Sequence, residues 1–169
     1  IMWYKNGILQ SNLTHSLIVP SSLTARDEMW YFSVEPKDGV EFGAPNSSLA
    51  VTILNSPPSF TEVYITPDPA FNTSTLTANP YGWFDNDNDT EGYVYQWQIL
   101  DGSWLNIPGE TSETLGLQHR GDYIRVNCTA YDGKDLGTSH LDTIMIVDSD
   151  PPTQDDPLLV SSHGTDRTD

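Results

Sequence analysis

The sequence predicts an all-β fold of β-sandwich modules joined in tandem. Three observations lead to this prediction: an internal repeat of 94 residues, strands in which apolar and polar residues alternate, and Asp-Gly turn signals between those strands. A repeat of this length is the size of one small β-sandwich module. No segment carries the apolar spacing of an amphipathic helix over a useful length.

The repeat becomes visible when the chain is shifted by 94 residues, which is the distance from Trp3 to Trp97. Segment 23–43 then lies over segment 117–137, with leucine, arginine, Asp-Gly and a later glycine at identical spacing. This agreement indicates a duplicated module. The matches are Leu23 with Leu117, Arg26 with Arg120, Val34 with Cys128, Gly43 with Gly137 and, slipped by one residue, 51–58 (VTILNSPP) with 144–152 (IMIVDSDPP).

The repeat also predicts how the chain divides. Counting back from Trp97 places the start of the second copy near Ser59, whereas the first copy has two residues before Trp3. We therefore expect the opening strands of the first copy to come from a longer polypeptide or, by strand donation, from a neighbouring molecule. The expected segments are 1–58, the C-terminal half of a repeat; 59–152, a complete repeat; and 153–169, a tail, linker or donor strand.

Strands of the complete repeat are expected where residues alternate between apolar and polar. Their ranges are 62–66, 74–79, 93–100, 104–107, 114–117, 122–131 and 140–147. One face of 122–131 carries Ile124, Val126, Cys128 and Ala130, and we expect it to pack on Trp97 as the central core residue. The other core positions expected are Trp30, Phe32 and Val34 in the first copy and Leu76, Ala78, Val94, Ile124, Val126, Cys128, Ala130, Ile144 and Ile146 in the second.

Composition excludes several classes of protein. The net charge of −17 disfavours nucleic acid and anionic membrane as partners. An aromatic content of 11% is too high for an acidic disordered chain. Cys128 is the only cysteine, so no intrachain disulfide forms, and its place over Val34 predicts a small core residue. No apolar run in the sequence is long enough for a membrane span.

Paired prolines stand where one copy of the repeat gives way to the next, in Ser-Pro-Pro at 56–58 and Asp-Pro-Pro at 150–152. Proline cannot join a central strand ladder and favours an extended, stiff connection. The joints between modules are therefore expected to be short and semi-rigid, which suits a rod or a filament.

The chain resembles the repetitive immunoglobulin-like modules of archaeal and bacterial surface proteins, of polycystic-kidney-disease and cadherin-like type. The residues that carry the resemblance are 95–97 (YQW) followed by 101–102 (DG), 121–126 (GDYIRV), 132–133 (DG) with Gly137, and the acidic run 85–89 (DNDND). The resemblance implies tandem immunoglobulin-like β-sandwiches, the first incomplete at its N-terminal side. It implies an extracellular or cell-surface spacer, adhesin, surface layer or filament protein whose partners are copies of itself, and it implies no reaction.

The acidic run predicts a metal site. Residues 85–91 alternate carboxylates with amides, and calcium takes six to eight oxygen ligands from such loops. In a sandwich this loop lies at the same end as the loop 132–137, and both face the joint that contains Asn55. We expect calcium to stiffen this junction; the alternative is a solvated acidic turn. The expected ligands are Asp85, Asp87, Asp89, Glu91, Asp132 and Asp135.

Five of the ten asparagines begin an N-glycosylation sequon, which favours a glycosylated extracellular protein. The alternative is chance in a chain rich in serine and threonine, and we adopt it for Asn88 because that residue lies within the acidic loop. The expected glycan sites are Asn12, Asn46, Asn72 and Asn127.

No catalytic set is recognisable in the sequence, so we expect no enzyme. The four histidines are scattered without zinc-site spacing, and we interpret Glu110 and Glu113 as solvated acids in a loop. The alternative functions are an adhesive or carbohydrate-binding module and, third, a module appended to a secreted hydrolase. Tyr81, Trp83, Phe84 and Trp104 could stack on sugar rings, although for Trp83 we favour packing against the neighbouring module.

Overall fold

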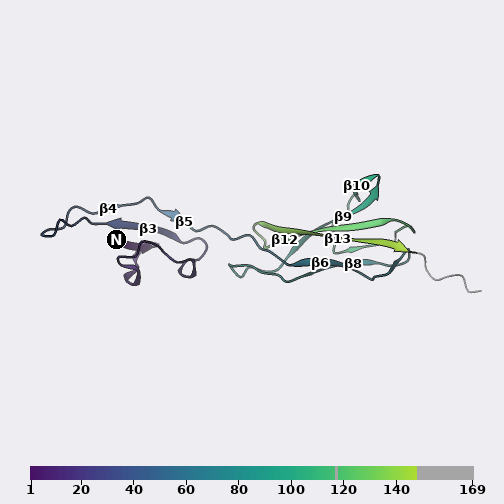
Figure 1. Ribbon diagram of the computed structural model, residues 1–169, viewed down its shortest axis with the longest axis horizontal. Helices are drawn as coiled ribbons and strands as arrows, with labels where there is room; N and C mark the ends of the chain where they lie inside the picture. Colours follow the sequence, from purple (N-terminus) through teal and green to yellow (C-terminus); the bar gives the residue numbers. More distant parts are fainter. Residues whose placement is uncertain (117, 148–169) are drawn as a thin grey trace, which may run out of the picture.

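The computed structural model describes residues 1–116 and 118–147. These residues form strands and loops, with two single-turn 3-10 helices. The prediction of an all-β fold is confirmed. The chain is long and narrow, and its two strand-rich parts lie end to end (Figure 1).

The first part is one antiparallel sheet in the order β2-β1-β3-β4, with β5 also pairing with β3. Its strands are β1 (Met2–Lys5), β2 (Ile8–Leu9), β3 (Met29–Val34), β4 (Asn46–Ser47) and β5 (Val51–Thr52). Between β2 and β3 lie the helices η1 (Ser11–Leu13) and η2 (Ser21–Leu23). Within the described residues, these strands pair with one another and not with later strands.

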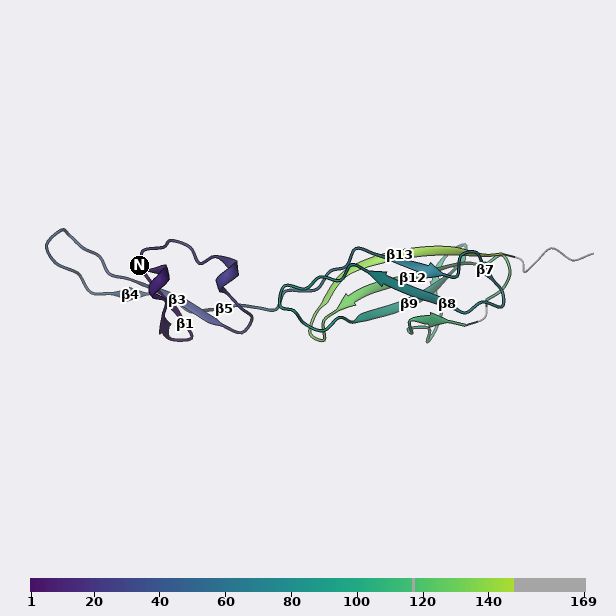
Figure 2. The ribbon, with the colours of Figure 1, turned by 90° about the horizontal axis from the view of Figure 1, so that it is seen from below.

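The second part consists of a five-stranded sheet, β10-β9-β12-β13-β7, and a three-stranded sheet, β11-β8-β6, which face each other (Figure 2). Its strands are β6 (Glu62–Thr66), β7 (Ala70–Phe71), β8 (Leu76–Tyr81), β9 (Tyr93–Asp101), β10 (Ser103–Asn106), β11 (Thr114–Leu115), β12 (Tyr123–Tyr131) and β13 (Leu136–Val147). Pairing within the sheets is antiparallel except between β7 and β13, which run parallel. The arrangement is that of a β-sandwich.

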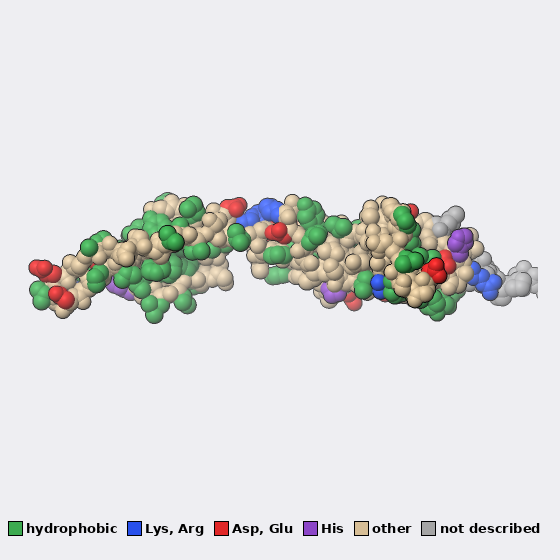
Figure 3. Space-filling model, turned by 90° about the horizontal axis from the view of Figure 1, so that it is seen from above, with side chains coloured by type: hydrophobic (Ala, Val, Ile, Leu, Met, Phe, Trp, Pro, Cys, Tyr) green, Lys and Arg blue, Asp and Glu red, His purple; other side chains and the backbone are tan. Residues whose placement is uncertain are grey.

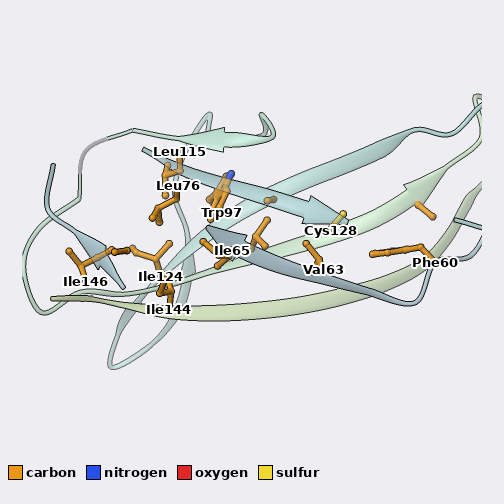
Figure 4. Packing of buried hydrophobic residues seen from close by; sticks show 14 residues of the cluster. Phe60, Val63, Ile65, Leu76, Trp97, Leu115, Ile124, Cys128, Ile144 and Ile146 are labelled. Carbon is orange, nitrogen blue, oxygen red and sulfur yellow. The ribbon is translucent and has the colours of Figure 1, made fainter. Parts of the chain in front are cut away.

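The core of the sandwich lies between these sheets and is centred on Trp97 (Figure 4). Trp97 is fully buried, and its indole N–H donates a hydrogen bond of 2.9 Å to the carbonyl oxygen of Ser112. Val94 was expected in the core, and this prediction is wrong, because its side chain is 46% exposed; the same prediction is wrong for Val34, which is exposed because its sheet has no second sheet across it in the described residues. Side chains on a strand alternate between faces, so Val94 lies on the outer face, whereas Tyr95 and Ile99 pack on the core with Trp97.

Most predicted strands have the predicted place, and the differences lie at their ends. β6 has the predicted bounds, β8 begins two residues later than expected, and β13 begins at Leu136 instead of His140. β7 was not predicted, because two residues are too few to show a period. Leu117, the last residue of one predicted strand, lies outside the described residues.

Strand register follows the 94-residue repeat. Trp3 pairs with Phe32 in the first sheet, and at the equivalent positions Trp97 pairs with Val126. The indole N–H of Trp3 also donates to a serine carbonyl oxygen, that of Ser16, at 3.0 Å. The two copies therefore share backbone geometry as well as sequence. The boundaries at residues 58 and 152 stay predictions, and the segment 153–169 lies outside the described residues.

Candidate metal centre

The acidic loop connects β8 to β9 at the end of the sandwich that faces the first part. Its start is fixed by two backbone hydrogen bonds of 2.8 Å between Phe84 and Ser59, at the end of the joint. Trp83 packs edge-on against Tyr93 with ring centres 5.6 Å apart. Trp83 therefore packs on the core of its own module, and its packing against the neighbouring module stays a prediction.

Asp85 organises the loop. Its Oδ1 atom accepts hydrogen bonds from the backbone N–H groups of Asp87 (2.8 Å) and Asp89 (3.1 Å), which curls the chain around the carboxylate. Asn88, in this curl, has a left-handed φ of 57°, which asparagine tolerates. The Oδ2 atom of Asp85 is buried and accepts no hydrogen bond from any residue that the structure describes. A buried carboxylate oxygen without a donor is costly, and a cation would satisfy it.

Asp85, Asp87 and Asp89 each offer one carboxylate oxygen, and these atoms lie within 4.8 Å of one another. Ligands of one calcium ion lie about 2.3–2.6 Å from it and therefore at most about 5 Å apart. The three carboxylates can thus hold one metal ion between them.

Arg26, from the first part of the chain, reaches across to this group. Its guanidinium forms a bidentate ion pair with Asp89 and lies 3.9 Å from Oδ2 of Asp87. Lys134 Nζ also contacts Asp89, at 3.2 Å. The hydrogen bonds from Arg26 hold the pKa of Asp89 below its ordinary value, and in return Asp89 raises the pKa of Arg26. Arg26 and Lys134 thus balance part of the negative charge of this group, through Asp87 and Asp89.

Asp132 and Asp135 lie in the β12–β13 loop. Asn55 joins them to the linker, which is the segment 53–58 after β5. The Nδ2 atom of Asn55 donates to Asp132 at 2.7 Å and to Asp135 at 2.9 Å, while its Oδ1 atom accepts from Arg26 at 2.6 Å. Burial raises the pKa of Asp132, but hydrogen bonds from Asn55 and from backbone N–H groups outweigh burial and lower it overall. A continuous polar network therefore connects the two parts of the chain.

The six predicted ligands occupy three different places. Asp85, Asp87 and Asp89 are brought together; Asp132 and Asp135 lie beside them in the Asn55 network. Glu91 accepts a hydrogen bond of 2.7 Å from the hydroxyl of Tyr93. Burial and this contact raise the pKa of Tyr93. The structure therefore does not bring Glu91 into the carboxylate group.

Arg26 is the functional residue that sequence reasoning missed. Its match with Arg120 in the repeat was visible, but the match alone did not show that its side chain crosses the joint. The ion pair joins residues 63 positions apart in the chain, and local sequence patterns do not report contacts of this range. The expected position of Asn55 at the joint, in contrast, agrees with its contacts.

The asparagines predicted to carry glycans are accessible to different degrees. Asn12, Asn46 and Asn72 are exposed, in η1, in β4 and after β7. Asn127 is half-buried on β12, between the inward Val126 and Cys128, so its side chain takes the outer face as predicted. Modification at these sites stays a prediction.

The remaining residues considered in the sequence analysis are Cys128 and the aromatic residues Tyr81, Phe84 and Trp104. Cys128 is fully buried, and burial raises the pKa of its thiol to about 12, so its predicted place in the core is confirmed. The ring of Trp104 is covered by the guanidinium of Arg125 at 4.3 Å. Tyr81 and Phe84 are exposed.

No protein-family model matches the chain, and no curated protein matches it. In the part of the chain that the structure describes, no helix has the length and apolar character needed to cross a membrane.

Proposed function

We propose that the chain is a non-catalytic structural segment of a repetitive extracellular surface or filament protein, in which immunoglobulin-like modules are held end to end at stiff joints. The observation that carries this proposal is the network across the joint, in which Arg26 and Asn55 bind the carboxylates of the following module. A flexible tether between independent modules needs no such contacts.

The linker itself supports a stiff joint. Pro58 is fully buried, and its carbonyl oxygen accepts a hydrogen bond of 3.2 Å from the N–H of Thr138. Two residues earlier, the backbone N–H of Ser56 donates to Oδ2 of Asp87 at 2.7 Å. The connection is therefore bound by the acidic loop and by β13 of the second module, and bending it would break these hydrogen bonds.

We further propose that calcium binds the carboxylates of Asp85, Asp87 and Asp89 and stiffens the joint. Carboxylate and amide oxygens are the ligands that calcium prefers, and the orphaned Oδ2 atom of Asp85 offers one such ligand. Several carboxylates in one small region also repel one another unless a cation balances them. In the calcium-bound protein, Arg26 would give up part of its contact with Asp87 and Asp89, and the ordered loop would still hold the linker through the N–H of Ser56 and through Asn55.

Calorimetry and small-angle scattering test this proposal. We expect the chain to bind one calcium ion below millimolar concentration and to keep an extended shape, with fewer bent conformations in calcium than in EDTA. The triple variant Asp85→Asn, Asp87→Asn, Asp89→Asn keeps the size of the side chains and should lose binding, whereas Asp101→Asn, at the distant end of β9, should keep it. Absence of binding and a scattering profile indifferent to calcium would sink the calcium proposal.

The extracellular setting and glycosylation belong to the same proposal. Three of the four expected glycan sites are exposed, as an oligosaccharide requires. Their modification is tested by mass spectrometry of protein from its native source, where unmodified asparagine at all four sites would contradict it. The non-catalytic assignment is supported by Cys128, whose raised pKa and burial make it a poor nucleophile.

A carbohydrate-binding or adhesive module is the second candidate. A surface hollow lined by Trp83, Phe84, Asp85, Asn88 and Asp89 combines aromatic rings with polar oxygens, as sugar sites do. Saturable binding of a glycan by the wild-type chain, lost in Phe84→Ala, would favour this function over a purely structural one.

A further inference from the structure

One face of the first sheet is largely uncovered, whereas the equivalent face in the second module is covered by another sheet. In the sandwich, β6 and β8 cover the inner face of β9 and β12. The first sheet has no second sheet across it within the described part of the chain, and hydrophobic side chains gather on the surface of this part (Figure 3). The segment with η1 lies beside β1, and Trp30 is buried, so only part of the face is covered.

Comparing the exposure of equivalent side chains in the two copies shows how much of this face is uncovered. The pairing of Trp30 with Val51 corresponds to the pairing of Ile124 with Ile144. Ile144 is 9% exposed, whereas Val51 is 63% exposed. Likewise Cys128 is fully buried, and Val34, at the same place in the repeat, is exposed. These positions carry core residues in both copies but have a core in only one.

The segment 17–19, which lies beside this face, corresponds to a paired strand of the second module. Ser16 and Ser112 both accept the indole hydrogen bond of the central tryptophan, so 17–19 corresponds to 113–115. In the second module this segment contains β11, which pairs with β8, and the N–H of Ala78 donates to the carbonyl oxygen of Glu113 at 2.9 Å. In the first part, Leu17 and Ile18 are 79% and 70% exposed and belong to no strand.

The loop at Asp38, at the far end of the first part, has the same form as the loop at Asp132, which binds the linker in the second module. Asp132 folds its loop by accepting hydrogen bonds from Lys134 N and Asp135 N. Asp38 does the same with Val40 N and Glu41 N, at 2.9 and 3.0 Å. The loop built by Asp132 binds Asn55 of the preceding linker. The Asp38 loop thus has the form of a receiving loop, at the edge of the open face.

From these correspondences we infer that the open face of residues 1–53 binds the opening strands of another copy of this repeat, equivalent to residues 59–94. Two strands with the inward pattern of Val63, Ile65, Leu76 and Ala78 would cover the face, and the second of them would pair with 17–19. This inference rests on the proposed function, because it names the partner through which such modules assemble.

The chemistry of the face favours this partner over the other apolar segment of the chain. Leu158-Leu159-Val160 is a single short patch in the sequence, whereas β6 and β8 together bury four apolar side chains in the second module. A strand pair of the repeat also brings the backbone donors that would pair with 17–19. One short strand would leave half of the face uncovered.

The test joins a second copy of residues 59–94 directly to Ile1, because the 94-residue shift places Ile1 over Tyr95, the residue that follows Val94. Hydrogen exchange of the amides of 17–19 should slow at least tenfold relative to the original chain, and tryptophan emission should shift to shorter wavelength. Val63→Asp with Ile65→Asp in the added copy should abolish both changes, whereas the outward Tyr64→Asp in the added copy should preserve them.

Unchanged exchange at 17–19, or equal behaviour of the inward and outward variants, would overturn the inference. Protection of 17–19 in the original chain that disappears on deletion of 153–169 would overturn it too, because the tail would then be the occupant. Calcium binding at Asp85, Asp87 and Asp89 is read separately by calorimetry. Failure of the inference is therefore distinguishable from failure of the proposed function.

Discussion

At the scale of single residues, the junction shows one acidic loop whose carboxylates act differently. Asp85 folds the loop through its Oδ1 atom, and its Oδ2 atom has no hydrogen-bond partner among the described residues, whereas Asp89 binds the guanidinium of Arg26. The sequence run of alternating acids and amides predicted a cation site but not these separate roles. They depend on Arg26, a residue of the preceding module, which no local motif reveals.

Removing the guanidinium should make the cation site stronger. Arg26→Gln is expected to raise calcium affinity by about 5-fold or more, because calcium then no longer competes with a cation for Asp87 and Asp89. Calorimetry measures the affinity, and Arg125→Gln, whose side chain contacts Gln98 and Trp104 on the outer face, is the matched control. Weaker calcium binding in Arg26→Gln would show that Arg26 supports the site instead of competing for it.

The ion pair between Arg26 and Asp89 should depend on pH. Because the folded pKa of Asp89 is lowered, the pair stabilises the protein fully above the ordinary aspartate pKa of about 3.9, and this contribution is lost as pH falls through the lower folded pKa. Carbon-13 NMR titration of the side chain should give a pKa for Asp89 below the ordinary value in calcium-free buffer, moving back toward it in Arg26→Gln. An identical titration in both proteins would contradict the ion pair.

At the scale of strands, the sequence predicts the second module well because its signals are local. Alternation along 123–131 and Asp-Gly turns define β12 and its neighbours, and one strand, β6, has the predicted bounds. The short β7 was missed because two residues show no period, and Val94 was misplaced although Trp97 was expected in the core, because residues three apart on a strand lie on opposite faces. The open first sheet was expected from the repeat, since half a module cannot bury its own core face.

The alternation of inward and outward side chains along β9 can be tested by mutation. Trp97→Ala should destabilise the second module by about 3–5 kcal/mol, since it empties the centre of the core and leaves the carbonyl oxygen of Ser112 without its donor. Val94→Ala, three residues earlier on the outer face, should change the unfolding free energy by at most about 0.5 kcal/mol. Urea denaturation followed by circular dichroism measures both, and equal losses would contradict the assignment of faces.

The linker lies close to β13, so the equivalent glycines of the two copies, Gly137 and Gly43, should tolerate substitution differently. A methyl group at Gly137 would overlap the carbonyl oxygen of Pro58, so Gly137→Ala should displace the linker and cost about 1–3 kcal/mol. At the equivalent Gly43 the nearest atom is Cγ of the Pro36 ring at 2.9 Å, which can move, so Gly43→Ala should cost less. Faster hydrogen exchange at the Thr138 amide should accompany the first change and not the second.

At the scale of the whole molecule, two copies of one repeat differ in what completes them. The second has both of its sheets and receives a linker from the module before it. The first copy has one sheet, yet it donates Arg26 and Asn55 to the joint. A module can therefore contribute residues to the joint at its C-terminal end without being a closed sandwich. The reason is that these residues, Arg26 and Asn55, lie on the β2–β3 connection and on the linker. In the array that we propose, stiffness would then depend on each joint separately.

Asn55 provides the test of that joint, because it bonds Arg26 on one side and Asp132 and Asp135 on the other. In Asn55→Ala the two parts should tumble with separate rotational correlation times in nitrogen-15 relaxation, whereas the wild-type protein should tumble as one elongated body. Leu54→Ala, an exposed residue of the same linker, should leave the joint unchanged. Independent tumbling already present in the wild-type protein would mean that the network across the joint does not hold the modules in line.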